Sequence, residues 1–142
     1  MEFTNPSDNE IRAILARPTT VAVVGCSDST SRDSLRIAKL LKTRGFKVIP
    51  VNPQLDAEAL RTELGEKCYP DLASIPEPVE IVDVFRRSEF VPEIAEAAIA
   101  KGARVLWCQL GVIHLDAARR AQKAGLTVLM DRCPAIEFAR LF

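Results

Sequence analysis

The sequence has no excess of charge of either sign and no long apolar run. Its 19 Lys and Arg residues equal its 19 Asp and Glu residues, so the formal net charge is zero. A surface that binds nucleic acids or anionic membranes usually leaves a basic excess, which is absent here. No apolar stretch approaches the roughly 20 residues that a transmembrane helix needs. We therefore expect neither a nucleic acid nor a membrane among the partners.

The sequence also lacks the patterns of a metal site, a disulfide scaffold and a secretory signal. Its four cysteines, Cys26, Cys68, Cys108 and Cys133, form no C-x-x-C pair, and His114 is its one histidine. Structural zinc usually needs closer ligand spacing. The polar, acidic start M-E-F-T-N-P-S-D-N-E differs from the basic and apolar start of a signal peptide. We expect a cytoplasmic protein without a bound metal, whose cysteines stay reduced.

Five short apolar runs, rich in β-branched residues, predict strands. A chain of 142 residues is long enough for one hydrophobic core, so residues 1–142 are expected to form a single domain. Several runs lack polar alternation, which is typical of parallel strands covered on both faces. The runs are Val21–Val24, Lys47–Val51, Val79–Phe85, Arg104–Trp107 and Leu126–Met130.

Helical patterns separate most of these runs. Residues 33–44, 90–101 and 115–124 have apolar side chains at helical spacing, and each pattern stops at a glycine that leads into a strand. This alternation predicts an α/β fold, a doubly wound parallel sheet of about five strands with flanking helices. Further helices are expected at Asn9–Ala16, Asp56–Leu64 and Ala135–Leu141.

Small and hydroxyl-bearing residues follow the first predicted strand, in the segment G-C-S-D-S-T-S-R-D at 25–33. Ligands of doubly wound sheets bind at the carboxyl ends of the strands. Gly25 permits a tight turn and a close approach to a ligand, and the amides that open the next helix attract an anion. Arg32 offers a charged fork for phosphate. Alternatively, Ser31 or Asp33 only caps the helix, which is compatible with an anion site.

The familiar glycine motifs of nucleotide-binding loops are missing. Without G-x-x-x-x-G-K-[ST], hydrolysis of ATP or GTP is not expected. An NAD-binding fold usually ends its second strand with an acid, whereas this strand ends with Val51, Asn52 and Pro53. Absence of the acid removes a repulsion against a phosphorylated ribose, which NADP and coenzyme A both carry, and Asn52 can bond to ribose or adenine. Alternatively, N-P only marks a strand-ending turn.

The third predicted strand runs directly into Phe85, Arg86 and Arg87 at the same edge. Phe85 could pack against a flat ring, and one arginine could bind a phosphate or stack on adenine. Alternatively, the two arginines are a solvated surface pair. Gln109 and Gly111, which follow the fourth strand, also fall on this edge.

Trp107 and His114 each have a structural interpretation, and the segment that follows the fifth strand has two alternative ones. We expect Trp107 in the core or at an interface rather than in contact with a ligand, and His114 lies near a helix start without a partner that would make it a catalytic base. The segment D-R-C-P at residues 131–134 either closes the ligand edge or caps the last helix.

Five motifs in a fixed order carry a family resemblance. They are V-A-V-V-G-C-S, K-V-I-P-V-N-P, V-D-V-F-R-R-S-E, W-C-Q-L-G-V and M-D-R-C-P. In this order they resemble small stand-alone CoA-binding proteins and the CoA-binding domain of the succinyl-CoA synthetase alpha subunit. The resemblance covers residues 11–141 and implies a Rossmann-like domain that binds coenzyme A or an acyl-CoA at the edge described above.

The resemblance extends to the loop after the first strand. By position, Gly25, Cys26 and Ser27 match the family's G-A-S loop, which implies contact with the pyrophosphate, and Arg32 matches a basic position that implies a phosphate contact. In two departures, Cys26 replaces the commoner alanine and Thr30 stands where proline is frequent. Because a helix N-terminus lowers the pKa of a thiol, Cys26 is also a candidate for a mixed disulfide with CoA.

The resemblance also assigns the neighbouring strand ends. Val51, Asn52 and Pro53 match V-N-P and would border the adenosine, while residues 85–87 would lie along the nucleotide or the pantetheine. The synthetase itself needs a second domain, a phosphorylated histidine and a partner subunit. The one histidine of this chain lies in no matching motif, so the resemblance implies binding without ligase activity.

Three hypotheses follow. The first is a CoA-binding protein that is not an enzyme and has no catalytic residues. The second is an NADP-linked enzyme or redox sensor on the same fold. The third is an interaction module with a vestigial cleft, and the sequence identifies no protein partner.

Overall fold

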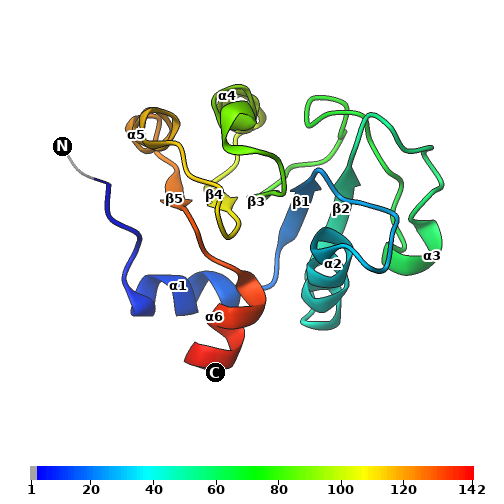
Figure 1. Ribbon diagram of the computed structural model, residues 1–142, viewed down its shortest axis with the longest axis horizontal. Helices are drawn as coiled ribbons and strands as arrows, with labels where there is room; N and C mark the ends of the chain where they lie inside the picture. Colours follow the sequence, from blue (N-terminus) through cyan, green and yellow to red (C-terminus); the bar gives the residue numbers. More distant parts are fainter. Residues whose placement is uncertain (1–2) are drawn as a thin grey trace.

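A parallel five-stranded sheet lies at the centre of the computed structural model, which describes residues 3–142 (Figure 1). The strand order is β2-β1-β3-β4-β5, and every neighbouring pair is parallel. This confirms the predicted α/β, Rossmann-like fold. The first two residues of the polar N-terminal stretch lie outside the described residues. The strands are β1 (Thr20–Val24), β2 (Lys47–Val51), β3 (Ile81–Val84), β4 (Val105–Cys108) and β5 (Thr127–Leu129).

Helices cover both faces of the sheet. Helices α4 and α5 lie on one face, and α1, α2 and α6 lie on the other (Figure 1). A short 3₁₀ turn, Ser88–Phe90, precedes α4. Within residues 3–142, no helix combines the length and apolar composition that a membrane span requires. The helices are α1 (Asp8–Leu15), α2 (Asp33–Thr43), α3 (Arg61–Leu64), α4 (Val91–Lys101), α5 (Leu115–Lys123) and α6 (Pro134–Leu141).

One helix is shorter than its pattern predicted. The predicted helix Asp56–Leu64 is helical only over its last turn, α3, and residues 57–60 form turns. The carbonyl of Ala57 accepts a hydrogen bond from the amide of Cys68 at 2.8 Å. This contact with a later segment replaces the helical ladder, so the long connection between β2 and β3 folds over the end of β2.

Burial on both faces explains the unbroken apolar character of the strands. In β1, Val21 and Val23 pack with the α1, α2 and α6 side chains, while Ala22 and Val24 pack with α4 and α5. Alternate residues therefore enter two separate cores, and neither face is left for polar residues. This packing puts β1 in the interior, between β2 and β3.

The strand order places a switch point between β1 and β3. From β1 the chain passes through α2 to β2 on one side, and after β2 it returns to β3 on the other side (Figure 1). Because the connections that follow β1 and β3 run in opposite directions, a crevice forms at the carboxyl ends of these two strands. Ligands of such folds bind in this crevice.

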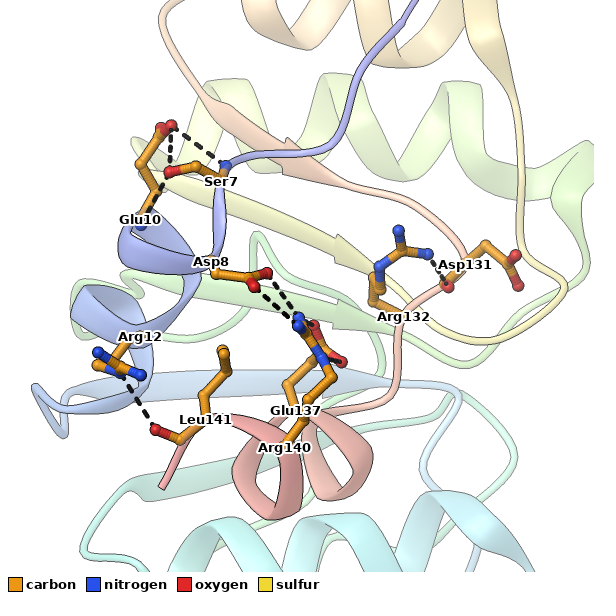
Figure 2. Close-up of polar contacts among 9 residues, drawn as sticks. All are labelled: Ser7, Asp8, Glu10, Arg12, Asp131, Arg132, Glu137, Arg140 and Leu141. Carbon is orange, nitrogen blue, oxygen red and sulfur yellow. Dashed lines mark hydrogen bonds and ion pairs between the residues drawn. The ribbon is translucent and has the colours of Figure 1, made fainter.

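Side-chain contacts join the first and last helices (Figure 2). The guanidinium of Arg140 donates to both carboxylate oxygens of Asp8, at 2.8 and 2.9 Å, and to the carboxylate of Glu137. Arg12 donates through Nε to the carbonyl of Leu141 at 3.1 Å. The two helices thus hold together beneath the sheet, on the face that carries α2.

Candidate functional site

Two cavities flank Gly25 at the carboxyl edge of the sheet. The first, which we call the α2 cavity, has a volume of about 570 Å³ and lies beside the start of α2. The second, the α4 cavity, has a volume of about 240 Å³ and lies beside α4. Eight of the ten predicted ligand residues line one cavity or both, and Cys26 and Arg87 line neither. The eight are Gly25, Ser27, Arg32, Asn52 and Phe85 in the α2 cavity, and Gly25, Val51, Pro53 and Arg86 in the α4 cavity.

Gly25 is required by a close backbone contact. Its amide donates to the carbonyl of Val51 at 2.8 Å, and its φ is +87°, a conformation that favours glycine. A Cβ atom at this position would lie 2.6 Å from the carbonyl oxygen of Phe85. The tight turn was predicted, but the approaching group is the end of β3. The glycine thus lets the ends of β1 and β3 pack together between the two cavities.

Asn52 fixes the loop that follows β1. Its Nδ2 donates to the carbonyl of Cys26 at 2.9 Å, and its Oδ1 accepts from the amide of Gln54 at 2.9 Å. The predicted strand-ending turn is therefore present. Asn52 therefore positions the loop, and one donor on Nδ2 and one lone pair on Oδ1 remain beyond these two bonds.

The start of α2 has no side-chain cap. The N-cap residue is Arg32, and within residues 3–142 no side-chain cap hydrogen bond forms at this end. The hydroxyl of Ser31 instead bonds to the hydroxyl of Ser29 at 2.8 Å, and the carboxylate of Asp33 pairs with Arg36. The capping alternative is therefore wrong. The first turn of α2 keeps its positive end open beside a cavity that Arg32 also lines.

Cys26 turns its side chain away from both cavities. The side chain is fully buried in the core beneath α2. Burial, together with the neighbouring Cys68 and Asp83, raises the pKa of the Cys26 thiol to about 12. The thiol is therefore protonated at neutral pH, and the prediction of a reactive Cys26 is wrong because desolvation outweighs the helix dipole. Only its backbone belongs to the loop.

The α4 cavity is mainly apolar, with charged groups at its wall. The guanidinium of Arg86 lies over the ring of Phe90, 4.2 Å from the ring centre. Asp71 and Glu93 supply acidic groups to the same wall. The guanidinium of Arg87 also lies over the Phe90 ring, 5.2 Å from the ring centre, and its Nε pairs with Glu89 at 3.1 Å. Val51, Pro53, Leu72, Ile94 and Ala97 provide the apolar surface.

A buried polar pair lies beneath this edge, and the sequence interpretation missed its acidic member. Asp83 in β3 is 1% exposed, and its Oδ1 accepts from Nε2 of Gln109. Within residues 3–142, the other carboxylate oxygen has no hydrogen-bond partner. Burial raises the pKa of Asp83 to about 7. Gln109 thus lies in the core instead of on the ligand edge; an isolated acid inside an apolar strand was the available signal.

The ends of β4 and β5 form a second, separate part of the edge. Trp107 lies in the core as predicted, and its Nε1 donates to the carbonyl of Arg132 at 2.9 Å. His114 is the N-cap of α5, where its Nδ1 accepts from Ala117 at 3.1 Å. Asp131 accepts from the amide of Gly111 at 2.7 Å and so closes the edge between these strands.

Two further cavities contain none of the predicted ligand residues, and one of them, of about 460 Å³, lies between the segment that follows β5 and α6. In the part of the chain that the structure describes, no group of three or more His, Cys, Asp or Glu could hold a metal ion. A cavity of about 380 Å³ lies between α1 and the amino ends of β3 to β5. It contains none of the predicted ligand residues and lies at the edge that ligands of parallel sheets do not use.

Comparisons with known proteins identify the family of the chain. A sequence model of the family described as "CoA binding domain" matches residues 19–139. An uncharacterized protein of Bacillus subtilis, YneT, is 42% identical over 135 residues, which are 95% of this chain and 96% of that one. The ADP-forming acetate–CoA ligase II of Archaeoglobus fulgidus is 34% identical over 89 residues, 61% of this chain but 12% of the ligase. A hypothetical protein of Pyrococcus horikoshii has a structure that superimposes with a TM-score of 0.87 at 39% identity, covering 99% of both chains.

Proposed function

Because the chain belongs to the CoA-binding domain family, we propose that it binds coenzyme A or an acyl-CoA without catalysing a reaction. The ligand would occupy both cavities that flank Gly25. The observation that carries this proposal is the uncapped start of α2 beside a polar cavity and adjacent to an apolar one. This pairing suits a ligand with an anionic centre and an uncharged aromatic end.

The α2 cavity suits the diphosphate. The open first turn of α2 attracts an anion, and Arg32 adds a positive charge. Of the two aspartates that line the cavity, Asp33 is paired with Arg36, so Asp28 is the acid that opposes the ligand. The loop is held in place before binding, which lowers the entropy cost of association.

The α4 cavity suits the adenine ring. Its apolar wall, which includes Val51 and Pro53, offers a surface for a flat ring. Arg86 already lies over one aromatic ring, that of Phe90, and a guanidinium stacks equally on adenine. The adenosine would therefore lie against the ends of β2 and β3, with the diphosphate crossing Gly25.

The surroundings of the site favour binding over catalysis and CoA over NADP. The residues that line the two cavities include no histidine or cysteine, so these linings do not provide a nucleophile–base pair of those types. The loop lacks the second and third glycines of the dinucleotide fingerprint. Asn52 carries no charge and already uses one lone pair of Oδ1 within the loop, so it is a weaker acceptor for ribose hydroxyls than the missing acid.

A calorimetric titration tests the proposal. The purified chain is titrated with CoA, dephospho-CoA, NADP and ATP. We expect CoA to bind most tightly and the loss of its 3′-phosphate to weaken binding. If CoA gave no measurable heat of binding, the proposal would be refuted, and tighter binding of NADP than of CoA would support the redox alternative.

Two arginine variants locate the binding site. Arg32→Ala should weaken CoA binding by roughly 1–3 kcal/mol, since a charge-assisted hydrogen bond is lost. The matched control is Arg61→Ala, because Arg61 pairs with Glu58 on α3 and lines neither cavity. Equal affinities of the two variants would remove Arg32 from the site.

A further inference from the structure

Ser34 occupies a position in the α2 cavity that the family motifs do not single out. It is the second residue of α2, it is 6% exposed, and it lines the cavity. Its Oγ accepts a hydrogen bond from the amide of Ser27 at 2.9 Å. The Ser27 amide, which the G-A-S resemblance assigns to the pyrophosphate, is therefore already engaged within the protein.

This contact leaves the proton of the Ser34 hydroxyl available. A serine hydroxyl is one donor and two acceptors. Among residues 3–142, the Ser34 hydroxyl is recorded only as the acceptor of the Ser27 amide. The neighbouring loop hydroxyls differ, since Ser29 and Ser31 bond to each other at 2.8 Å. A nearly buried donor that faces a cavity, without an acceptor of its own, is suited to an acceptor on a ligand.

We infer that Ser34 binds the diphosphate directly, by donating its hydroxyl proton to a phosphate oxygen while it accepts from the Ser27 amide. This inference rests on the proposed function of the α2 cavity. The amide of Ser27 polarises the hydroxyl, and a chain of two hydrogen bonds runs from the backbone to the anion. Ser34 is thus the residue through which the loop and the first turn of α2 bind the same phosphate.

Ser34→Ala and Ser34→Thr separate the hydroxyl from the rest of the side chain. Ser34→Ala should bind CoA and ADP roughly 10- to 100-fold more weakly, the range for a hydrogen bond to a charged group. Ser34→Thr keeps the hydroxyl and should recover most of that loss. Binding of adenosine, which has no phosphate, should be unchanged in both variants. The control is Thr43→Ala, which removes a hydroxyl from the other end of α2, where it bonds to the carbonyl of Lys39 at 3.0 Å.

The outcomes distinguish this inference from the proposed function. Urea unfolding of each variant first shows that it is folded. If the unmodified chain binds CoA and Ser34→Ala binds it equally well, the inference fails while the proposed function stands. If folded Ser34→Thr loses as much affinity as Ser34→Ala, the hydroxyl is not the binding group and the inference also fails. If the unmodified chain binds no CoA, both fail.

Discussion

Asp83 should make the stability of the protein depend on pH in an unusual direction. Burial raises the pKa of its carboxyl group from 3.8 to about 7 in the folded protein. Between these values the folded state holds a proton that the unfolded chain has lost. Rising pH therefore lowers the free energy of unfolding, and the effect levels off above about pH 7. Most surface carboxylates of folded proteins act in the opposite direction.

The magnitude follows from the size of the shift. Each pH unit between the two pKa values contributes about 1.4 kcal/mol, so about 2–3 kcal/mol is lost from pH 5 to pH 8. The neighbouring thiols of Cys26 and Cys108 do not contribute, because burial raises the pKa of each to about 12. Asp83→Asn keeps an acceptor for Gln109 and cannot ionise, so it should remove this loss.

Urea unfolding of both proteins at about pH 5 and about pH 8 measures the effect. The free energy of unfolding of the unmodified chain, relative to Asp83→Asn, should fall by about 2–3 kcal/mol across this interval. The control is Asp116→Asn, since the Asp116 side chain is 88% exposed, and this variant should run parallel to the unmodified chain. If the free energy of unfolding of Asp83→Asn instead changed with pH as that of the unmodified chain does, the carboxyl group would not be held protonated by burial.

Three further predictions concern the loop after β1. Gly25→Ala should lower the free energy of unfolding in urea by about 2–4 kcal/mol, because a Cβ would meet the Phe85 carbonyl in a left-handed backbone; unchanged stability would contradict this. Asp28→Asn should tighten CoA binding in calorimetry by roughly two- to fivefold, less at high salt, and weaker binding would contradict the assigned repulsion. Iodoacetamide at about pH 8 should label the half-buried Cys133 before the fully buried Cys26 in peptide mass spectra, and the reverse order would contradict the buried thiol.

The strand and helix patterns predicted most of the fold, because strands that are buried on both faces appear in the sequence as unbroken apolar runs. The run Lys47–Val51 predicts the bounds of β2, and the glycines at 45, 102 and 125 predict where helices end. The pattern at Asp56–Leu64 failed because its helical ladder competes with a contact from the distant Cys68. A periodic pattern cannot show a partner that lies far along the chain.

The candidate site was predictable by position but not by orientation. Residues that follow neighbouring parallel strands must meet at one edge, which brings Gly25, Asn52 and Phe85 to the same cavity. Which way a side chain points depends on local turns, and these direct Cys26 into the core and use the amide of Asn52 within the loop. The hydroxyl of Ser34 was overlooked because a serine in the first turn of a helix is common and carries no signal by itself.

A crystal structure of the chain with bound CoA tests the central claim most directly. We predict the diphosphate between the loop at Gly25 and the first turn of α2, with the adenine in the α4 cavity. A diphosphate bound at any other part of the surface, with the α2 cavity filled by protein side chains, would contradict the account.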